Sequence, residues 1–131
     1  MIFYIENEPT SARQIAELRQ SVGWNRMQEC YQNPLMTSYF HIACYDGEKL
    51  IGYIDAVSNG VTDAYIQDLI VDPVYQGKGI GTELMNRTIS HLKDRKIFMI
   101  SVLFDEKLLT FYKRFGFKIM LCGQMQTYEM E

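Results

Sequence analysis

Residues 68–82 read DLIVDPVYQGKGIGT and form the most informative run of the chain. An apolar, β-rich stretch ends at Val71, a turn containing Pro73 follows, and glycines then open an amphipathic helix. The first helical turn leaves its backbone N–H groups without intrahelical partners, and glycines let a ligand approach them closely. These amides and the positive helix end favour a phosphate or pyrophosphate, and Lys78 adds a full positive charge. We therefore predict a site for a phosphorylated cofactor.

The spacing of the glycines excludes two common phosphate loops. A Walker A loop places four residues between its first glycine and a Gly-Lys-Ser/Thr, and no such run exists here. The dinucleotide fingerprint needs a third glycine three residues after the second, where Thr82 stands, and Gly81 comes one residue early. The pattern present is Gln-x-x-Gly-x-Gly over residues 76–81. It resembles the acetyl-CoA signature of the GNAT superfamily of N-acetyltransferases, and the family's second motif is recognisable in FYKRFGF, residues 111–117.

Size and composition limit the remaining choices. At 131 residues the chain is long enough for one core, so we expect a single domain over residues 1–131. The formal net charge of −3, without a Lys/Arg stripe, argues against nucleic acid as the main partner. Three cysteines far apart and no Cys-x-x-Cys pair predict reduced thiols in a cytoplasmic chain, and two isolated histidines predict no metal site. Because no signal peptide or long apolar span is present, we expect no membrane association.

Hydrophobic periodicity and turn signals divide the chain into elements. The predicted strands cover residues 2–5, 38–45, 49–57, 64–71, 97–103, 117–121 and 126–130, with 97–103 central. Helices are predicted from a cap at Thr10 or Ser11 to Gly23, from a cap at Asn25 to Tyr31, from the glycines to Asp94, and from a cap at Asp105 to Gly116. This pattern alone indicates an α/β or α+β fold. The resemblance implies a GNAT-like mixed central sheet of about seven strands flanked by about four helices, with a splay between strands 4 and 5.

The resemblance also implies how acetyl-CoA is held, as a co-substrate. Its pantetheine arm pairs with a free edge of the fourth strand, and its pyrophosphate rests on the glycine-rich amides. Asp105 falls beside the arm, although capping a helix would also explain it. The implied cofactor-binding residues are Leu69, Ile70, Val71, Gln76, Gly77, Lys78, Gly79, Ile80, Gly81, Thr82 and Asp105.

Two side chains are candidates for the chemistry. Tyr112 lies at the family's general-acid position, where its hydroxyl donates to the departing sulfur; alternatively it belongs to the apolar stripe of its helix. Asp68 is the nearest match to a general base on the fourth strand, and its alternative is a solvated strand-edge aspartate. The base would offset the roughly 4 kcal/mol needed to deprotonate an alkylamine at neutral pH.

The amine acceptor is expected beside the first two helices. The resemblance assigns Trp24, Met27 and Tyr31 to this side, where aromatic walls suit an arylalkylamine, a polyamine or a peptide N-terminus. Each of these residues could instead pack the core. The resemblance further allows a homodimer that forms through the C-terminal strands.

We thus predict an N-acetyltransferase that moves the acetyl group of acetyl-CoA to a primary amine, of a small molecule or peptide, by direct attack in a ternary complex. One alternative is a transferase for a longer acyl-CoA. Another is a catalytically idle acyl-CoA-binding sensor or regulatory module, which would be insensitive to loss of the Tyr112 hydroxyl. A nucleotide-binding interaction domain is the third, and would require ATP or NAD to compete with CoA.

Overall fold

The computed structural model describes residues 1–130. Its strands are β1 (Ile2–Glu6), β2 (Phe40–Asp46), β3 (Lys49–Ser58), β4 (Asp63–Val71) and β5 (Met99–Val102). Its α-helices are α1 (Ala12–Ser21), α2 (Gln28–Tyr31), α3 (Ile80–Asp94) and α4 (Leu109–Lys113). Three 3-10 turns join them: η1 (Pro34–Thr37), η2 (Pro73–Tyr75) and η3 (Glu106–Leu108). None of the helices in this part of the chain is long and apolar enough to cross a membrane.

The strands form one mixed sheet in the order β1-β2-β3-β4-β5. The first four are antiparallel to their neighbours, while β4 and β5 are parallel and are joined through α3. The predicted hairpin between β2 and β3 is confirmed, because Gly47 takes the left-handed angle, φ 60°, that a tight turn needs. A register shift between Asp55 and Ala56 of β3 marks a bulge against β4.

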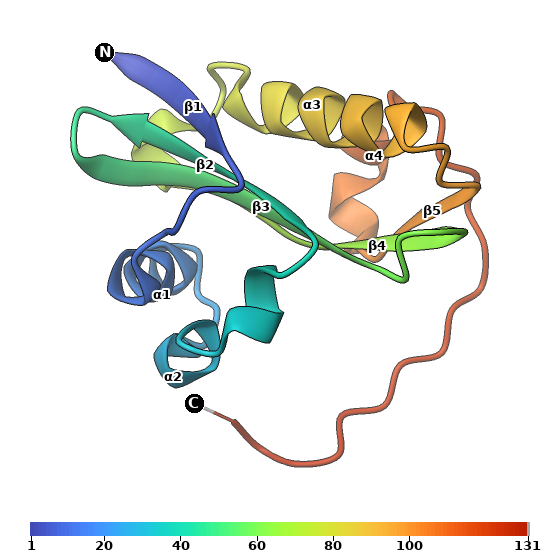
Figure 1. Ribbon diagram of the computed structural model, residues 1–131, viewed down its shortest axis with the longest axis horizontal. Helices are drawn as coiled ribbons and strands as arrows, with labels where there is room; N and C mark the ends of the chain where they lie inside the picture. The colour runs from blue at the N-terminus through green and yellow to red at the C-terminus, as the bar shows by residue number, and fades with distance from the viewer. Residues whose placement is uncertain (131) are drawn as a thin grey trace.

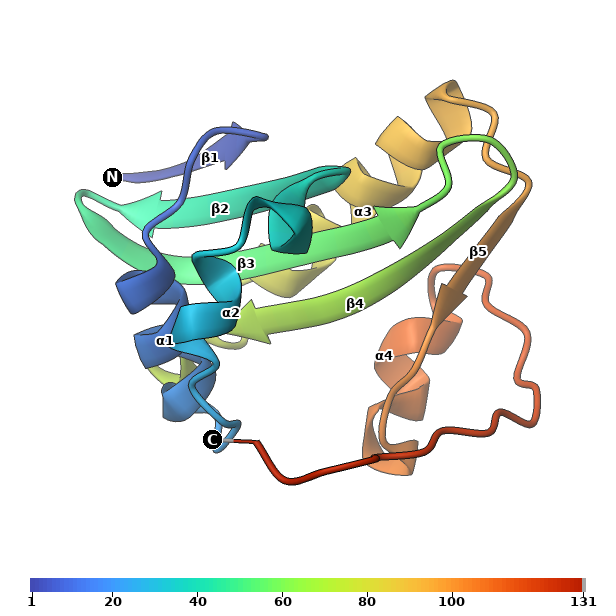
Figure 2. The same cartoon turned by 60° about the horizontal axis from the view of Figure 1, so that its bottom comes forward.

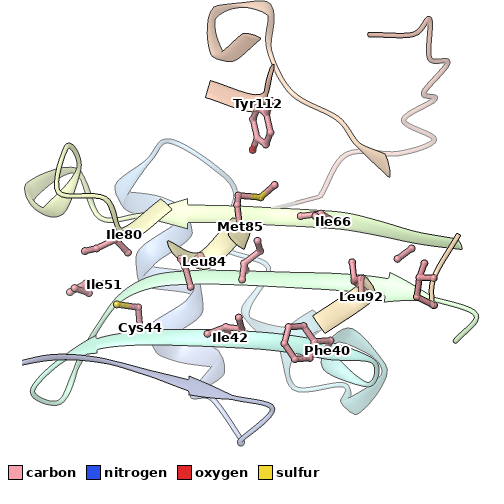
Figure 3. Close-up of a cluster of buried hydrophobic side chains, with 13 residues drawn as sticks. Phe40, Ile42, Cys44, Ile51, Ile66, Ile80, Leu84, Met85, Leu92 and Tyr112 are labelled. Carbon is pink, nitrogen blue, oxygen red and sulfur yellow. The ribbon is translucent and has the colours of Figure 1, made fainter. Parts of the chain in front are cut away.

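Helices cover both faces of the sheet, as Figure 1 shows, with α1 and α2 on one face and α3 and α4 on the other. The larger hydrophobic cluster lies under α3 and α4 and includes Leu84, Met85 and Leu92, which are fully buried (Figure 3). A second cluster lies under α1 and α2 and includes Ile15, Leu18, Tyr31, Tyr53 and Ile70. The three central strands, β2, β3 and β4, thus contribute side chains to both cores.

The two predicted C-terminal strands are wrong: the described sheet has five strands, not seven. After α4 the chain runs in an extended arc back to α2, where Asn25 Nδ2 donates to the Met130 carbonyl at 3.3 Å (Figure 2). Residues 118–130 are exposed throughout and pair with no strand of the described chain. The β-forming character of 117–121 is real, but a strand needs a hydrogen-bonded neighbour, and none is present. For the same reason β5 is an edge strand rather than the central strand predicted.

The first two helices begin differently from each other. Ser11 caps α1 as predicted, by accepting from the Gln14 N–H at 3.2 Å. Asn25 does not cap α2, because its Oδ1 and its carbonyl both accept from Arg19. Met27 stands at the cap position instead, with a left-handed backbone at φ 50° and no side-chain cap. A tertiary contact thus outweighs the local capping preference of Asn25.

Candidate active site

The turn before α3 leaves a row of backbone amides free. Gly77 and Gly79 adopt left-handed backbone angles, φ 79° and 85°, and a Cβ at either position would meet no atom within 4 Å. The Glu83 N–H makes the first helical hydrogen bond, to the Gly79 carbonyl at 3.0 Å. Within residues 1–130, no protein group accepts a hydrogen bond from the amides of residues 77–82. Because these amides lie at the positive end of a 15-residue helix, they can bind an anion.

Two cationic side chains flank this row of amides. Lys78 comes from the turn itself, as the sequence predicted, and its Nζ lies 5.4 Å from the centre of the Tyr75 ring. Arg114 comes from the residue after α4: its Nη2 donates to Thr82 Oγ1 at 3.1 Å, and its guanidinium lies 5.0 Å from the centre of the Phe111 ring. Sequence reasoning missed Arg114 as a site residue, although its charge within the second motif was an available signal. Both cations reinforce the attraction for a phosphate.

The second half of β4 has a free edge. β4 pairs with β5 only over residues 63–66, and the two strands then diverge, as predicted for strands 4 and 5 (Figure 2). The Asp72 N–H donates to the Ile51 carbonyl of β3 at 2.8 Å. Because successive N–H groups of a strand point to opposite edges, the Val71 and Leu69 N–H groups point away from β3. A peptide-like ligand can pair with this edge as an added strand.

The other predicted cofactor residues surround this edge. Gln76 Nε2 donates to the Val71 carbonyl at 2.9 Å and so closes the turn. The side chains of Ile70 and Ile80 are buried in the two cores. The backbone of Ile80 can reach a ligand, whereas the Ile70 N–H points toward β3, so the predicted cofactor role of Ile70 is not supported at this edge. Asp105 is exposed at the start of η3 and caps it through its carbonyl, which accepts from the Leu108 N–H at 2.8 Å. Its side chain makes no cap hydrogen bond, so the predicted side-chain cap is wrong.

Tyr112 projects from α4 toward β4 and the α3 core (Figure 3). Its ring stacks on Phe104 at 4.4 Å and meets Phe111 edge-on at 5.0 Å, so it packs as part of the apolar stripe. Burial, and next the neighbouring Tyr65, raises the pKa of Tyr112 to about 12. Hence the hydroxyl stays protonated across the neutral range and can only donate there. Packing and proton donation are compatible, because the ring packs while the hydroxyl points toward β4.

Asp68 lies in a buried polar cluster on the α1 and α2 face of the sheet. Its Oδ2 accepts from Arg19 Nη1 at 3.0 Å and from the Tyr31 hydroxyl at 2.7 Å. The side chains of Arg19 and Asp68 are only 7% and 14% exposed. The alternative of a solvated strand-edge aspartate is therefore wrong. The fold also brings together two residues that were predicted separately, Asp68 and Tyr31.

Sequence reasoning missed Asp55, which is the most buried carboxylate of the described chain at 1% exposed. Its Oδ2 lies 3.5 Å from the Tyr31 hydroxyl, and its Oδ1 has no hydrogen-bond partner there. Burial, and next the Asp68 carboxylate, raises the pKa of Asp55 to about 8, against the opposing effects of the Tyr53 hydroxyl and Arg19. The available signal was an aspartate inside the apolar run of β3.

The predicted acceptor residues Trp24 and Met27 border this cluster. The Arg19 guanidinium lies 5.3 Å from the centre of the Trp24 ring, and Met27 packs against the core beside Tyr31. On the far side of Met27 is an open hollow of about 820 Å³ between α2 and the C-terminal segment. Its lining residues are Arg26, Met27, Gln28, Glu29, Cys30, Gln32, Glu129 and Met130.

Comparison with known sequences matches this chain to proteins described as acetyltransferases. Residues 3–117 match the acetyltransferase (GNAT) family. The chain is 31% identical over 111 residues to an uncharacterized N-acetyltransferase ycf52-like protein of Prochlorococcus marinus, covering 81% of this chain and 62% of that one. It is 40% identical over 78 residues to the chloroplastic GCN5-related N-acetyltransferase 2 of Arabidopsis thaliana, covering 56% and 30%. The chain thus spans less than two thirds of the length of both relatives.

Solved structures share the fold. A GNAT-family acetyltransferase from Streptococcus pneumoniae is 29% identical, with a TM-score of 0.76 over the whole of both chains. A probable acetyltransferase from Staphylococcus aureus reaches a TM-score of 0.86 at 23% identity, covering 98% of this chain and all of that one. A Clostridium acetobutylicum acetyltransferase solved with acetyl-CoA has a TM-score of 0.74 at 16% identity, covering 97% and 96%.

Proposed function

The chain belongs to the acetyltransferase (GNAT) family, and on that premise we propose that residues 1–131 form one domain that transfers the acetyl group of acetyl-CoA to a primary amine. One observation carries the proposal: the free edge of β4 lies next to the row of free amides before α3. The first suits the amide-containing arm of CoA, and the second suits its pyrophosphate. The N-acetyltransferase names of the sequence relatives, and the acetyl-CoA in the Clostridium structure, support it.

The residues present fit this co-substrate. The lack of side chains at Gly77 and Gly79 leaves open space over the amides, which a pyrophosphate can occupy. Lys78 and Arg114 would supply the counter-charge. Asp105 would lie beside the arm at the start of η3. In this assignment acetyl-CoA binding depends mainly on backbone groups. Replacing a glycine of the turn should therefore weaken binding more than replacing any one side chain.

The acetyl group would then lie at the free edge of β4, beside Val71. The Val71 N–H would donate to the thioester oxygen and stabilise the negative charge that develops there as the amine attacks. Tyr112 would donate its proton to the sulfur as the C–S bond breaks and the new C–N bond is complete. Because burial keeps Tyr112 protonated, the proton is present across the neutral pH range.

The acceptor would approach from the side of α1 and α2. Asp68 would accept the proton that the ammonium group must lose, directly or through water, and Trp24, Met27 and Tyr31 would contact the rest of the amine.

Thermal unfolding with acetyl-CoA, CoA, ATP and NAD tests the proposal. Acetyl-CoA at about 100 times its dissociation constant is expected to add about 2.7 kcal/mol, a rise in Tm of roughly 10 °C for this size. Gly79→Glu should abolish the rise, because a carboxylate would enter the anion site. Gly23→Glu is the matched control: Gly23 has φ 84° and open space like Gly79, so it shares the backbone strain.

The outcomes separate the alternatives. A rise with acetyl-CoA that Gly79→Glu abolishes and Gly23→Glu keeps supports the cofactor site. A larger rise with a longer acyl-CoA would indicate that the acyl chain is longer than acetyl. No rise with acetyl-CoA, or a rise with ATP or NAD instead, would overturn the proposal.

A further inference from the structure

A row of ionisable side chains crosses three strands on the face covered by α1 and α2. His41 of β2 is paired in register with Asp55 of β3, and Asp55 is paired with Asp68 of β4. Residues directly opposite on neighbouring strands share a face. Arg19 from α1 and Tyr31 from α2 close over the row. The row therefore places two carboxylates side by side beneath two helices.

The hydrogen bonds of Arg19 leave Asp55 without a counter-ion. Arg19 Nη1 donates to Asp68, while its Nε and Nη2 donate to the carbonyl and Oδ1 of Asn25 at 2.6 and 2.7 Å. No Arg19 nitrogen makes a hydrogen bond to Asp55 in the described chain. One guanidinium thus serves two buried carboxylates, and a buried anion without a partner is costly. A proton on one of the two carboxyls removes this cost.

Tyr31 connects the two carboxyls. Its oxygen lies 2.7 Å from Asp68 Oδ2 and 3.5 Å from Asp55 Oδ2, and a hydroxyl has a single hydrogen to donate. When Asp55 is protonated, it can donate to the Tyr31 oxygen while Tyr31 donates to Asp68, and both contacts are satisfied. When Asp55 is ionised, the two carboxylates compete for the one hydrogen of Tyr31, and the Tyr53 hydroxyl and the Asp68 N–H are the other donors near Asp55.

We propose that Asp55 and Asp68, bridged by Tyr31, hold one proton between them, and that Asp55 stores the proton which the acceptor amine gives to Asp68. The inference rests on the proposed function. In the step, an N–H bond of the ammonium breaks, its electron pair stays on nitrogen, and an O–H bond forms on Asp68. Tyr31 then accepts this proton at its oxygen and gives its own hydrogen to an ionised Asp55. Asp68 is again a carboxylate, and Asp55 is the acid.

The pH range of the pair follows from its surroundings. Burial and the charge of Asp68 hold the pKa of Asp55 well above its usual range, at about 8. Asp55 can accept a proton only when it is ionised, which is the case above about pH 8. Below that pH Asp55 is already protonated and cannot take up the proton from Asp68. The ionisable groups that face Asp55 from neighbouring elements are Arg19, Tyr31, His41, Tyr53 and Asp68.

Carbon-13 NMR of aspartate-labelled protein tests the shared proton without any acceptor. One carboxyl is expected to titrate with a midpoint near 8. It should vanish in Asp55→Asn and move in Tyr31→Phe, which keeps both carboxyls and the ring. Asp63→Asn, an exposed aspartate of β4, is the matched control and should leave it unchanged. If every aspartate carboxyl titrates below pH 5, the inference is overturned.

The pH profile of acetyl transfer tests the use of the proton. Thiol release from acetyl-CoA is followed from pH 6 to 9.5 with the best of phenethylamine, spermidine and a tripeptide. The rate of thiol release by the unaltered protein should rise as the pH passes through 8. In Asp55→Asn this rise should be absent, and the rate at pH 9 should be about 100-fold lower than that of the unaltered protein. Identical profiles would overturn the role of Asp55. Thiol release with none of the amines would count against the proposed function, while the NMR midpoint would still decide whether the proton is shared.

Discussion

Replacing Asp55 by asparagine is expected to change how the stability of the protein depends on pH. The folded pKa of Asp55 is about 8, against 3.8 for an ordinary aspartate. Its folded pKa is raised, so the folded state binds the proton more tightly than the unfolded chain does. This contribution to stability is fully present below about pH 4 and is lost as pH rises from 4 to 8.

The size of the effect follows from the shift. Each pKa unit corresponds to about 1.4 kcal/mol, so the unaltered protein should lose about 5 kcal/mol of unfolding free energy across this range through Asp55 alone. That is a large share of the 5–15 kcal/mol typical of a folded domain. Asparagine has no proton to lose, so Asp55→Asn should lack this fall and gain stability relative to the unaltered protein as pH rises.

Urea unfolding at pH 5 and pH 8, at fixed ionic strength, measures the effect. The difference in unfolding free energy between Asp55→Asn and the unaltered protein should shift by several kcal/mol toward the variant between the two pH values. Asp63→Asn, exposed on β4, should show no such shift. An equal difference at both pH values would refute the reasoning, because it would mean that Asp55 is ionised in the folded protein.

Three further predictions concern other parts of the molecule. Tyr112→Phe should lower the rate of acetyl transfer about 100-fold while the calorimetric affinity for acetyl-CoA changes less than about 2-fold; an unchanged rate would leave the tyrosine a packing residue. Leu84→Ala should cost about 2–5 kcal/mol in urea unfolding because the Leu84 side chain of α3 is fully buried against the sheet, and a loss below 1 kcal/mol would contradict the packing described. Ile119 and Leu121 of the C-terminal segment are apolar and exposed, which supports pairing of two copies. Light scattering should therefore give about twice the 15.3 kDa of one chain, and Leu121→Asp the mass of one; a single-chain mass for the unaltered protein would count against pairing.

The cofactor side of the site could be predicted from the sequence because its signals are local. Gly77 and Gly79 are needed for left-handed backbone angles within one turn, and the strand before them and the helix after them are neighbours along the chain. The divergence of β4 from β5 came from the family resemblance rather than from any pattern of the residues. The register of β4 and β5, which pair only over residues 63–66, confirms this divergence. The two motifs thus predicted a tertiary feature that local sequence patterns do not indicate.

The acceptor side could be predicted only in part, because it is assembled from distant parts of the chain. Arg19, Asp55 and Asp68 come from α1, β3 and β4, and only the strand register brings the two carboxyls side by side. Local preference also misled twice. Asn25 is a good cap but is taken by Arg19, and residues 117–121 are good strand formers without a partner. In each case a tertiary contact, present or absent, decided the outcome.

The most direct test of the central claim is an amide NMR titration of the uniformly nitrogen-15-labelled protein with acetyl-CoA. We predict that the largest shifts fall on Leu69 and Val71 at the free edge of β4 and on residues 77–82 before α3. Saturable shifts confined to these amides would place acetyl-CoA where the free backbone groups lie. Unchanged amides at both places, or shifts concentrated elsewhere in the molecule, would contradict the account.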